Sequence, residues 1–254
     1  MELHKLAALV EYDGTGFAGY QRQPGGRTVQ GEIETAIVKL SGAETRVHAA
    51  SRTDTGVHAC GQVISFWIRN DLSPDVVVRA LNHYLPEDIA IRGACVIDGD
   101  FDVRRRALSR RYVYRIAHQP TRAPLVDRYC LVVKDSLNVG LMRQAARELT
   151  GVHDFASFAT SLEDGETTVR VVHEARIVET EDMIECSIVA NAFLRHQVRN
   201  TVGQLLRVGL EKCSPDEFAD LVDRPRRASA GPAAPSRGLC LSGVRYEEPL
   251  PFAA

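Results

Sequence analysis

The sequence lacks the cysteine spacing of a zinc knuckle or of a disulfide-stapled domain. Its six cysteines are scattered over 254 residues, and no two of them form a Cys-x-x-Cys pair. Zinc knuckles and small disulfide frameworks both need cysteines at short, regular intervals, so both classes are excluded. The six are Cys60, Cys95, Cys130, Cys186, Cys213 and Cys240. Several of them lie in apolar, strand-like segments and are predicted to be small core residues.

Long apolar runs, a signal-peptide pattern and an excess of basic residues are also missing. No segment reaches the roughly 20 apolar residues that span a bilayer, and the N-terminus carries the charged Glu2 and Lys5. The 31 Lys and Arg against 33 Asp and Glu give a formal charge of −2. We therefore expect a soluble, cytoplasmic protein, which would need segregated charge to bind nucleic acid.

Arginine is nevertheless concentrated in one segment. Phe101 to Arg115 holds six arginines and a single acid, Asp102. A solvated strand edge explains most such runs. The functional alternative is a track of phosphate contacts, to which Arg22, Arg195 and Arg199 would add; such contacts position RNA without reading its sequence.

The length and the 44% hydrophobic content predict two medium-sized domains. Apolar periodicity in the first part gives the order β-α-β-β-α-β, which is typical of a split-βαβ, ferredoxin-like unit. The predicted strands are residues 3–12, 45–50, 62–68 and 89–97, and the helices begin after Thr28 and Ser73.

The second part is less regular but has a similar content. Strands are predicted at residues 107–117, 129–133, 169–179, 183–189 and 239–246, and helices after Ser136, over 194–211 and after Ser214, with loops at 153–159 and 226–238 and an exposed insertion at 161–168. The predicted fold class is therefore α+β: two ferredoxin-like subdomains whose antiparallel sheets join, with helices on one face and a central cleft. The domains are residues 1–100, which carry the Asp54 loop, and residues 101–254, which complete the cleft.

A glycine motif follows the first predicted strand. Residues 14–19 read Gly-Thr-Gly-Phe-Ala-Gly, the G-x-G-x-x-G pattern of dinucleotide binding. That pattern works only when a helix starts at once and its N-terminal N–H groups receive the pyrophosphate. Residues 20–26 contain Pro24, Gly25 and Gly26 and cannot open a helix. A nucleotide-dependent enzyme therefore stays a minor alternative.

The segment Ser51 to Ala59 connects two predicted strands and carries the most suggestive carboxylate, Asp54. Three interpretations are open for Asp54: a residue that caps a turn, a metal ligand together with His48 and His58, and a lone catalytic carboxylate. Spacing alone does not choose among them. For His58 a structural role, bracing the loop through hydrogen bonds, is the simpler expectation.

Short motifs along nearly the whole chain resemble the tRNA pseudouridine synthase A family. They occur in the family's order and are specific as a set: Glu11-Tyr12-Asp13-Gly14, Gln21-Arg22-Gln23, Thr28-Val29-Gln30, Arg52-Thr53-Asp54, Gly56-Val57-His58, Arg111-Tyr112, Asn191-Ala192-Phe193-Leu194, His196, Val198-Arg199-Asn200, Gly203 and Gly238-Leu239. The resemblance implies an isomerase that converts uridine to pseudouridine around positions 38–40 of the tRNA anticodon arm. It also implies no cofactor and a homodimer that binds tRNA.

The resemblance further implies roles for five residues. Asp54 matches the catalytic aspartate, acting either as a nucleophile or as a base that removes a sugar proton. Arg199 matches the partner that keeps this carboxylate ionised, and Tyr112 the ring that stacks on the extruded base. Arg52 matches the residue that assists extrusion, and Leu239 the one that packs against the uracil.

Without the resemblance, bland interpretations hold for three of these residues. Tyr112 and Leu239 would be core side chains, as strand aromatics and aliphatics usually are, and Arg199 would face solvent from a helix. The chain also departs from the usual family pattern: Asp102-Val103 replaces His-Ala, and Arg195 and Gln197 replace His and Met. A non-catalytic RNA-binding protein is the remaining alternative.

Overall fold

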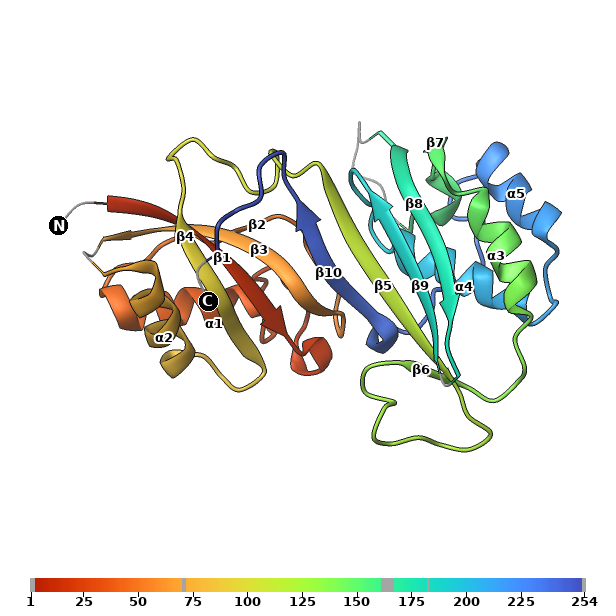
Figure 1. Ribbon diagram of the computed structural model, residues 1–254, viewed down its shortest axis with the longest axis horizontal. Coiled ribbons are helices and arrows are strands. Elements are labelled where there is room, and N and C mark those ends of the chain that lie inside the picture. Colours follow the sequence, from red (N-terminus) through yellow and green to blue (C-terminus); the bar gives the residue numbers. More distant parts are fainter. Residues whose placement is uncertain (1–2, 70–71, 161–166, 182, 253–254) are drawn as a thin grey trace. The chain divides into compact units, whose positions relative to one another are not determined.

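The computed structural model describes residues 3–69, 72–160, 167–181 and 183–252. These residues form an α+β protein with five α-helices and ten strands (Figure 1). The chain groups into two compact units: unit 1 is residues 1–110 and 240–254, and unit 2 is residues 111–239. The division predicted from the sequence places residues 101–110 and 240–254 with the second part, whereas here they group with unit 1.

Unit 1 contains a sheet of strand order β4-β1-β3-β10, with the short β2 paired to β3. Strand β1 is antiparallel to β3 and to β4, and β10 is parallel to β3. Helices α1 and α2 pack on each other, α1 contacts β3 and α2 contacts β4 (Figure 1). The elements are β1 (Leu3–Tyr12), α1 (Val29–Ser41), β2 (His48–Ala49), β3 (His58–Arg69), α2 (Pro74–Tyr84), β4 (Ile89–Val96) and β10 (Leu239–Arg245).

Unit 2 contains a sheet of strand order β5-β9-β8-β7, with β6 parallel to β5. Helices α3, α4 and α5 pack on one another, and α3 contacts β8. The elements are β5 (Ser109–His118), β6 (Leu131–Val133), α3 (Val139–Arg147), β7 (Gly151–Asp154), η2 (Ala156–Phe158), β8 (Val169–Glu179), β9 (Met183–Ala190), α4 (Gln197–Gly209), α5 (Pro215–Asp223) and η3 (Ser236–Gly238).

Local capping signals explain why some helices begin and end where the sequence predicts. The Thr28 side chain accepts a hydrogen bond from the backbone N–H of Gly31 at the start of α1. Gly42 ends α1 with a φ of 71°, a left-handed conformation that glycine adopts at little cost. Ser214 and Glu217 form a reciprocal capping box at the start of α5.

Each unit has its own apolar core. In unit 1, alternate residues of β1 and β3 face α1 and α2; fully buried members include Ile33, Ile37, Ile64, Phe66 and Leu81. In unit 2 the core lies among the helices, η2 and the strands; fully buried members include Tyr114, Ile116, Met142, Leu149, Phe155, Phe158 and Phe218. Within the described part of the chain, no helix combines the length and the apolar character that crossing a bilayer requires.

The glycine motif does not open an α-helix. Residues Gly14–Gly16 form a single 3-10 turn, η1, capped by the Asp13 side chain, and α1 begins only at Val29. The helix N-terminus that a dinucleotide pyrophosphate needs directly after the motif is therefore missing from this place. The nucleotide-binding interpretation loses its structural basis.

Several predicted boundaries are wrong. Strand β3 starts at His58, not at residue 62, and β2 covers two residues instead of six. Helix α4 starts at Gln197 because His196 has a φ of 62° and cannot belong to a right-handed helix. Asn138, not Ser136, caps α3, while residues 151–154, predicted as a helix end and a loop, form β7 against β8. Most of the predicted insertion, residues 161–166, lies outside the described residues.

The cap of α5 gives a stability prediction with an internal control. Replacing Ser214 by Ala removes the acceptor for the Glu217 N–H and should lower the free energy of unfolding by about 1 kcal/mol. Ser73 occupies the same cap position before α2, but its side chain makes no cap hydrogen bond. Ser73→Ala should therefore cost clearly less in urea unfolding followed by circular dichroism. Equal losses in the two variants would contradict the capping argument.

Candidate active site

The Asp54 loop connects β2 to β3 in unit 1 and ends in a tight turn. The Val57 N–H donates to the Asp54 carbonyl oxygen at 3.1 Å, and Gly56 has a φ of 76° at the third turn position. This closing hydrogen bond uses the backbone carbonyl, which any residue at position 54 supplies. The Asp54 side chain is partly exposed.

The start of the loop is fixed by hydrogen bonds to the sheet. The Gln62 side-chain amide donates to the Ser51 carbonyl at 2.7 Å and accepts from the Ser51 N–H at 3.2 Å. The Ala50 N–H donates to the Val63 carbonyl at 2.8 Å. Gln62 is completely buried, so this side chain acts as an extension of the strand ladder. The loop thus starts from a fixed backbone position.

Thr53, next to Asp54, is held by two residues from the end of β1 and just beyond it. Its Oγ1 lies 2.7 Å from the Tyr12 hydroxyl, and its carbonyl accepts from the Tyr20 N–H at 3.0 Å. Thr53 and both tyrosines are buried. Burial raises the pKa of Tyr20 well above its ordinary value, and nearby Tyr12 and Glu34 add to the effect, so Tyr20 is a neutral phenol.

The metal-site interpretation of Asp54, His48 and His58 is not supported. Among the described residues, no group of three His, Cys, Asp or Glu side chains could hold a metal ion. His58 instead faces the residues after β1: its Nδ1 lies 3.1 Å from the Gly14 N–H and 3.2 Å from Asp13 Oδ1. A neutral Nδ1 accepts from Gly14, and a protonated one donates to Asp13. Either state braces the start of β3.

Arg52 lies on the same loop as Asp54, two residues earlier. Its side chain is exposed, whereas the Thr53 between them is buried. The alternation places the guanidinium on the outer side of a loop whose inner side is anchored. An exposed arginine beside a partly exposed carboxylate can reach an RNA strand without breaking internal contacts.

Tyr112, Arg199 and Leu239 belong to unit 2. Tyr112 lies on β5 and is only 5% exposed, and its ring packs edge-on against Phe193 with centroids 5.1 Å apart. Leu239 begins β10 and is 4% exposed. Both are thus as buried as the core interpretation predicts. A stacking role for Tyr112 would use the part of the ring that Phe193 leaves uncovered.

Arg199 lies in the first turn of α4 and is partly buried. Its Nε donates to the Ala234 carbonyl at 2.8 Å, and the Ala234 N–H donates back to the Arg199 carbonyl at 2.9 Å. The interpretation of Arg199 as a solvent-facing helix residue is therefore wrong. The segment before η3 therefore holds the Arg199 side chain at Nε, which restricts the orientations of its guanidinium group.

The residue that departs from the family pattern before Arg199 has a structural role. Gln197 Oε1 accepts a hydrogen bond from the Leu194 N–H at 2.8 Å. This contact closes the turn that leads into α4 and gives the buried Gln197 amide oxygen a hydrogen-bond partner. The substitution of Gln for Met is therefore compatible with the helix that carries Arg199.

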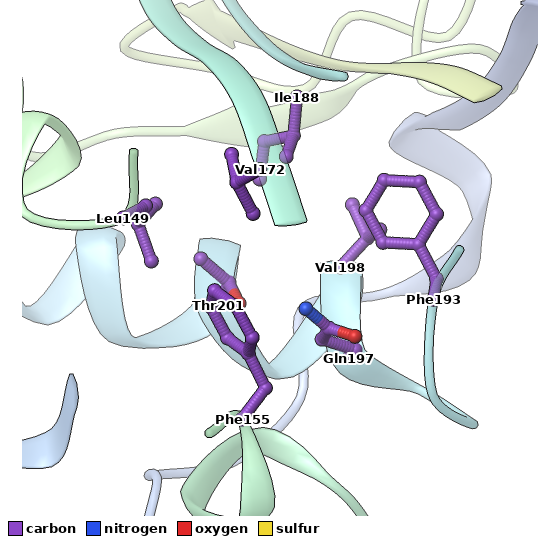
Figure 2. A pocket seen from close by; sticks show the side chains of 8 residues that line it. All are labelled: Leu149, Phe155, Val172, Ile188, Phe193, Gln197, Val198 and Thr201. Carbon is purple, nitrogen blue, oxygen red and sulfur yellow. The ribbon is translucent and has the colours of Figure 1, made fainter. Parts of the chain in front are cut away.

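Figure 2 shows a small space within unit 2 that is mostly apolar. It has no room for a water molecule, so it cannot admit a uracil ring. It is a packing gap between α4, the sheet and η2. The lining side chains are Leu149, Phe155, Val172, Ile188, Phe193, Gln197, Val198 and Thr201.

The arginine-rich segment is not one exposed strand. Residues 102–107 form a loop in which Asp102 Oδ1 accepts from the N–H groups of Arg104 and Arg105 at 2.8 and 3.0 Å. Partial burial raises the pKa of Asp102, but these hydrogen bonds, with the charges of Arg105 and His48, outweigh it and lower the pKa overall. The carboxylate therefore stays ionised and holds the loop, whose Arg104, Arg105 and Arg106 side chains are exposed.

Arg110 has a structural role that the sequence did not predict. It is buried, and its Nε and Nη2 donate to the Ala50 carbonyl at 3.2 and 3.0 Å, next to the Asp54 loop. Its other bonds reach the carbonyls of Ala107 and Arg104. Arg111 and Arg115 lie opposite Glu174 and Glu185 at 3.7 and 2.9 Å. The exposed phosphate track is therefore smaller than the arginine count indicates.

The residues that anchor the loop could not be found from the sequence. Tyr12 and Thr53 are 41 positions apart, and Arg110 is 60 positions from Ala50. No local pattern links such pairs. The one available signal was positional: Tyr12 ends an apolar strand, where a hydroxyl can reach a neighbouring loop.

Three comparisons bear on this arrangement. The family model described as "tRNA pseudouridine synthase" matches residues 8–104 and 145–247. "tRNA pseudouridine synthase A" of Shouchella clausii is 38% identical over 249 residues, covering 98% of this chain and 95% of its own. The protein of the same name from Paramagnetospirillum magneticum is 42% identical over 241 residues, with 94% and 93% covered.

A remote likeness adds no argument. It is to the "Structure of H/ACA RNP bound to a substrate RNA containing 2'-deoxyuridine", with 12% identity and a TM-score of 0.38 over 79% of this chain and 44% of that chain. The sequence matches have much higher identity, 38% and 42%, and cover nearly the full length of this chain.

The α+β fold fits the class that the family model defines, the pseudouridine synthases, which are isomerases. Within that class, the near-complete coverage at about 40% identity is decisive: the chain belongs to the tRNA pseudouridine synthase A family.

The buried Arg110 gives a prediction that separates structural from exposed arginines. Arg110→Gln should lower the free energy of unfolding by about 2–3 kcal/mol, because the carbonyls of Ala50 and Ala107 lose a charged donor. Arg106→Gln, at an exposed position of the same segment, should change it by less than about 0.5 kcal/mol. Urea unfolding measures both; similar stability of the two variants would show that Arg110 is not a structural anchor.

Proposed function

We propose that the protein converts uridine to pseudouridine around positions 38–40 of the tRNA anticodon stem-loop without a cofactor. The observation that carries this proposal is the Asp54 carboxylate. It lies in the family-matched Arg52-Thr53-Asp54 segment, on a loop that Gln62 holds at Ser51 and Tyr12 holds at Thr53. The relatives named tRNA pseudouridine synthase A supply the substrate class.

The reaction is an isomerisation. The bond between N1 of uracil and C1′ of the ribose breaks, the detached ring turns, and C5 bonds to C1′; the proton from C5 leaves and N1 gains one. Atoms and electrons balance without an oxidant, a reductant or a hydrolysed group. The protein has only to cleave and re-form one bond at C1′ while it retains the uracil, and a carboxylate can do so as a nucleophile or as a base.

Asp54 is the proposed catalytic residue, and Tyr112, Arg52, Arg199 and Leu239 are proposed to bind the substrate. The aromatic ring of Tyr112 suits stacking on an extruded base, which recovers part of the energy of unstacking. The exposed Arg52 suits extrusion, and the anchored Arg199 supplies a positive charge of fixed position. Leu239 provides an apolar contact for the uracil face.

The finer description of the fold is also a proposal: two ferredoxin-like subdomains, the first carrying the Asp54 loop. In unit 1 the order β4-β1-β3 with β2 on β3, and the antiparallel pairing of these four strands, support it. A homodimer and a cytoplasmic location are inherited from the family resemblance. The exposed Arg104, Arg105 and Arg106 are proposed phosphate contacts.

Removing the carboxylate tests the function directly. Asp54→Asn keeps the size of the side chain and the backbone hydrogen bond of the turn. It should reduce the rate of pseudouridine formation by at least about 1,000-fold, while the affinity for tRNA changes less than about threefold. The measurement is mass spectrometry of a derivatised, unmodified tRNA transcript.

Asp100→Asn is the matched control, since it removes one negative charge at an exposed position of the same unit. It should leave turnover unchanged. Turnover retained in Asp54→Asn would refute the assignment of Asp54. If the unaltered protein binds tRNA tightly but forms no pseudouridine in it, a non-catalytic RNA-binding protein is favoured instead.

Cofactor independence has its own test. Protein that has been dialysed against EDTA and freed of nucleotides should form pseudouridine at the same rate as untreated protein, because the proposed reaction needs only a carboxylate and the substrate. Added NAD or ATP should not raise the melting temperature, as it would if either bound the native state tightly. A rate that falls on dialysis and returns with a metal ion or nucleotide would contradict the proposal.

A further inference from the structure

The glycine motif that fails as a nucleotide loop contacts the Asp54 loop at both of its ends. Gly14 is buried, and a Cβ at this position would overlap the backbone carbonyl of Val57. At the other end, a Cβ on Gly19 would lie 3.1 Å from the Thr53 oxygen, 3.3 Å from the Thr55 nitrogen and 3.4 Å from the Asp54 carbonyl carbon. Gly16, in the middle, has only ordinary contacts.

Position 19 also requires glycine because of its backbone conformation. Its φ of 101° lies in the region that side-chain-bearing residues rarely adopt. The residues on both sides of it are hydrogen-bonded: the Ala18 N–H donates to the Arg27 carbonyl at 2.8 Å, and the Tyr20 N–H to the Thr53 carbonyl at 3.0 Å. Gly19 therefore cannot relax without moving one of these contacts.

The same segment is tied to the start of α1. The Val29 and Gln30 N–H groups donate to the carbonyls of Gly19 and Tyr20 at 3.3 and 2.9 Å. Segment 13–20 is thus held by the helix on one side and holds the Asp54 loop on the other. Tyr12 completes the support through its hydroxyl at Thr53 Oγ1.

We propose that the glycine segment, residues 13–20, is a positioning device for the catalytic carboxylate, with Gly19 and Tyr12 as positioning residues that set the place of Asp54 through Thr53. This inference rests on the proposed function of Asp54 and explains the motif that nucleotide binding does not. A displacement of about 1 Å at a reacting group can cost on the order of 100-fold in rate. The contacts described above are those that prevent such a displacement.

The test compares two glycines with the same backbone requirement. Gly25 has a φ of 81°, but a Cβ there would meet nothing within 4 Å. Gly19→Ala and Gly25→Ala both carry backbone strain, yet only the first presses on the Asp54 loop. Gly19→Ala should lower kcat on the order of 100-fold with unchanged KM and tRNA affinity; Gly25→Ala should leave kcat within about twofold, since no contact to the loop is altered.

A third glycine separates this inference from nucleotide binding. A dinucleotide site needs the middle glycine so that the backbone can approach the phosphates, whereas the positioning role does not. Gly16→Ala should therefore retain full activity. The melting temperature of each variant is recorded, and Gly19→Ala and Gly25→Ala are compared at a temperature well below both transitions.

If Gly19→Ala does not fold, Tyr12→Phe keeps the test decisive. It removes only the hydroxyl at Thr53 Oγ1 and should lower kcat about tenfold with KM unchanged. Tyr246→Phe is its control, because the Tyr246 hydroxyl is also buried but donates to the Val103 carbonyl at 2.8 Å. Tyr246→Phe should cost stability without lowering kcat.

The outcomes separate the two proposals. An unaltered protein that forms no pseudouridine would overturn the proposed function and leave the positioning role without a reaction to serve. An active unaltered protein in which Gly19→Ala matches Gly25→Ala, or in which KM rises while kcat stays constant, would overturn the positioning role alone. A kcat loss in Tyr246→Phe equal to that in Tyr12→Phe would do the same.

Discussion

The hydrogen bonds on Thr53 are the constraint on which the candidate site depends. The Tyr20 N–H and the Tyr12 hydroxyl fix its carbonyl and its side chain at 3.0 and 2.7 Å. Asp54 follows directly in the chain and starts the turn that Val57 closes. A catalytic group must be held before the substrate arrives, because ordering it during the reaction costs rate. The end of β1 and the glycine segment both contact Thr53, and the first turn of α1 holds the glycine segment in its turn.

Local sequence signals predicted the elements whose ends depend on local chemistry. Thr28 and Gly42 bound α1, and Ser214 with Glu217 starts α5, because each cap involves residues within one helical turn. Boundaries set by distant partners were missed. Strand β3 begins four residues early because Ala59 pairs with Tyr12 and His58 with Cys240. Helix α4 begins later than predicted because His196 has a left-handed backbone conformation, which apolar periodicity does not reveal.

The same division holds for the candidate site: its local features could be predicted from the sequence, and its distant contacts could not. Asp54 stood out as a carboxylate between two strands, and the resemblance named its companions, but nothing in the sequence showed what holds the loop. Arg110 looked like one of six interchangeable arginines, yet it is buried against the Ala50 carbonyl. The glycine motif already failed as a phosphate loop because no helix follows it, but the sequence did not show what the motif contacts instead. Tyr12 lies 41 residues from Thr53 and Arg110 lies 60 residues from Ala50, so physical contact, not a local pattern, defines their roles.

Amide hydrogen exchange of the protein without RNA tests most directly whether the Asp54 loop is held in advance. The Tyr20 and Val57 amides, which donate to the Thr53 and Asp54 carbonyls, should exchange as slowly as amides in the middle of β1. The amides of Gly25 and Gly26, in an exposed loop, should exchange fast. If the Tyr20 and Val57 amides exchange as fast as those two glycines, the loop is not anchored before the substrate binds, and the account fails.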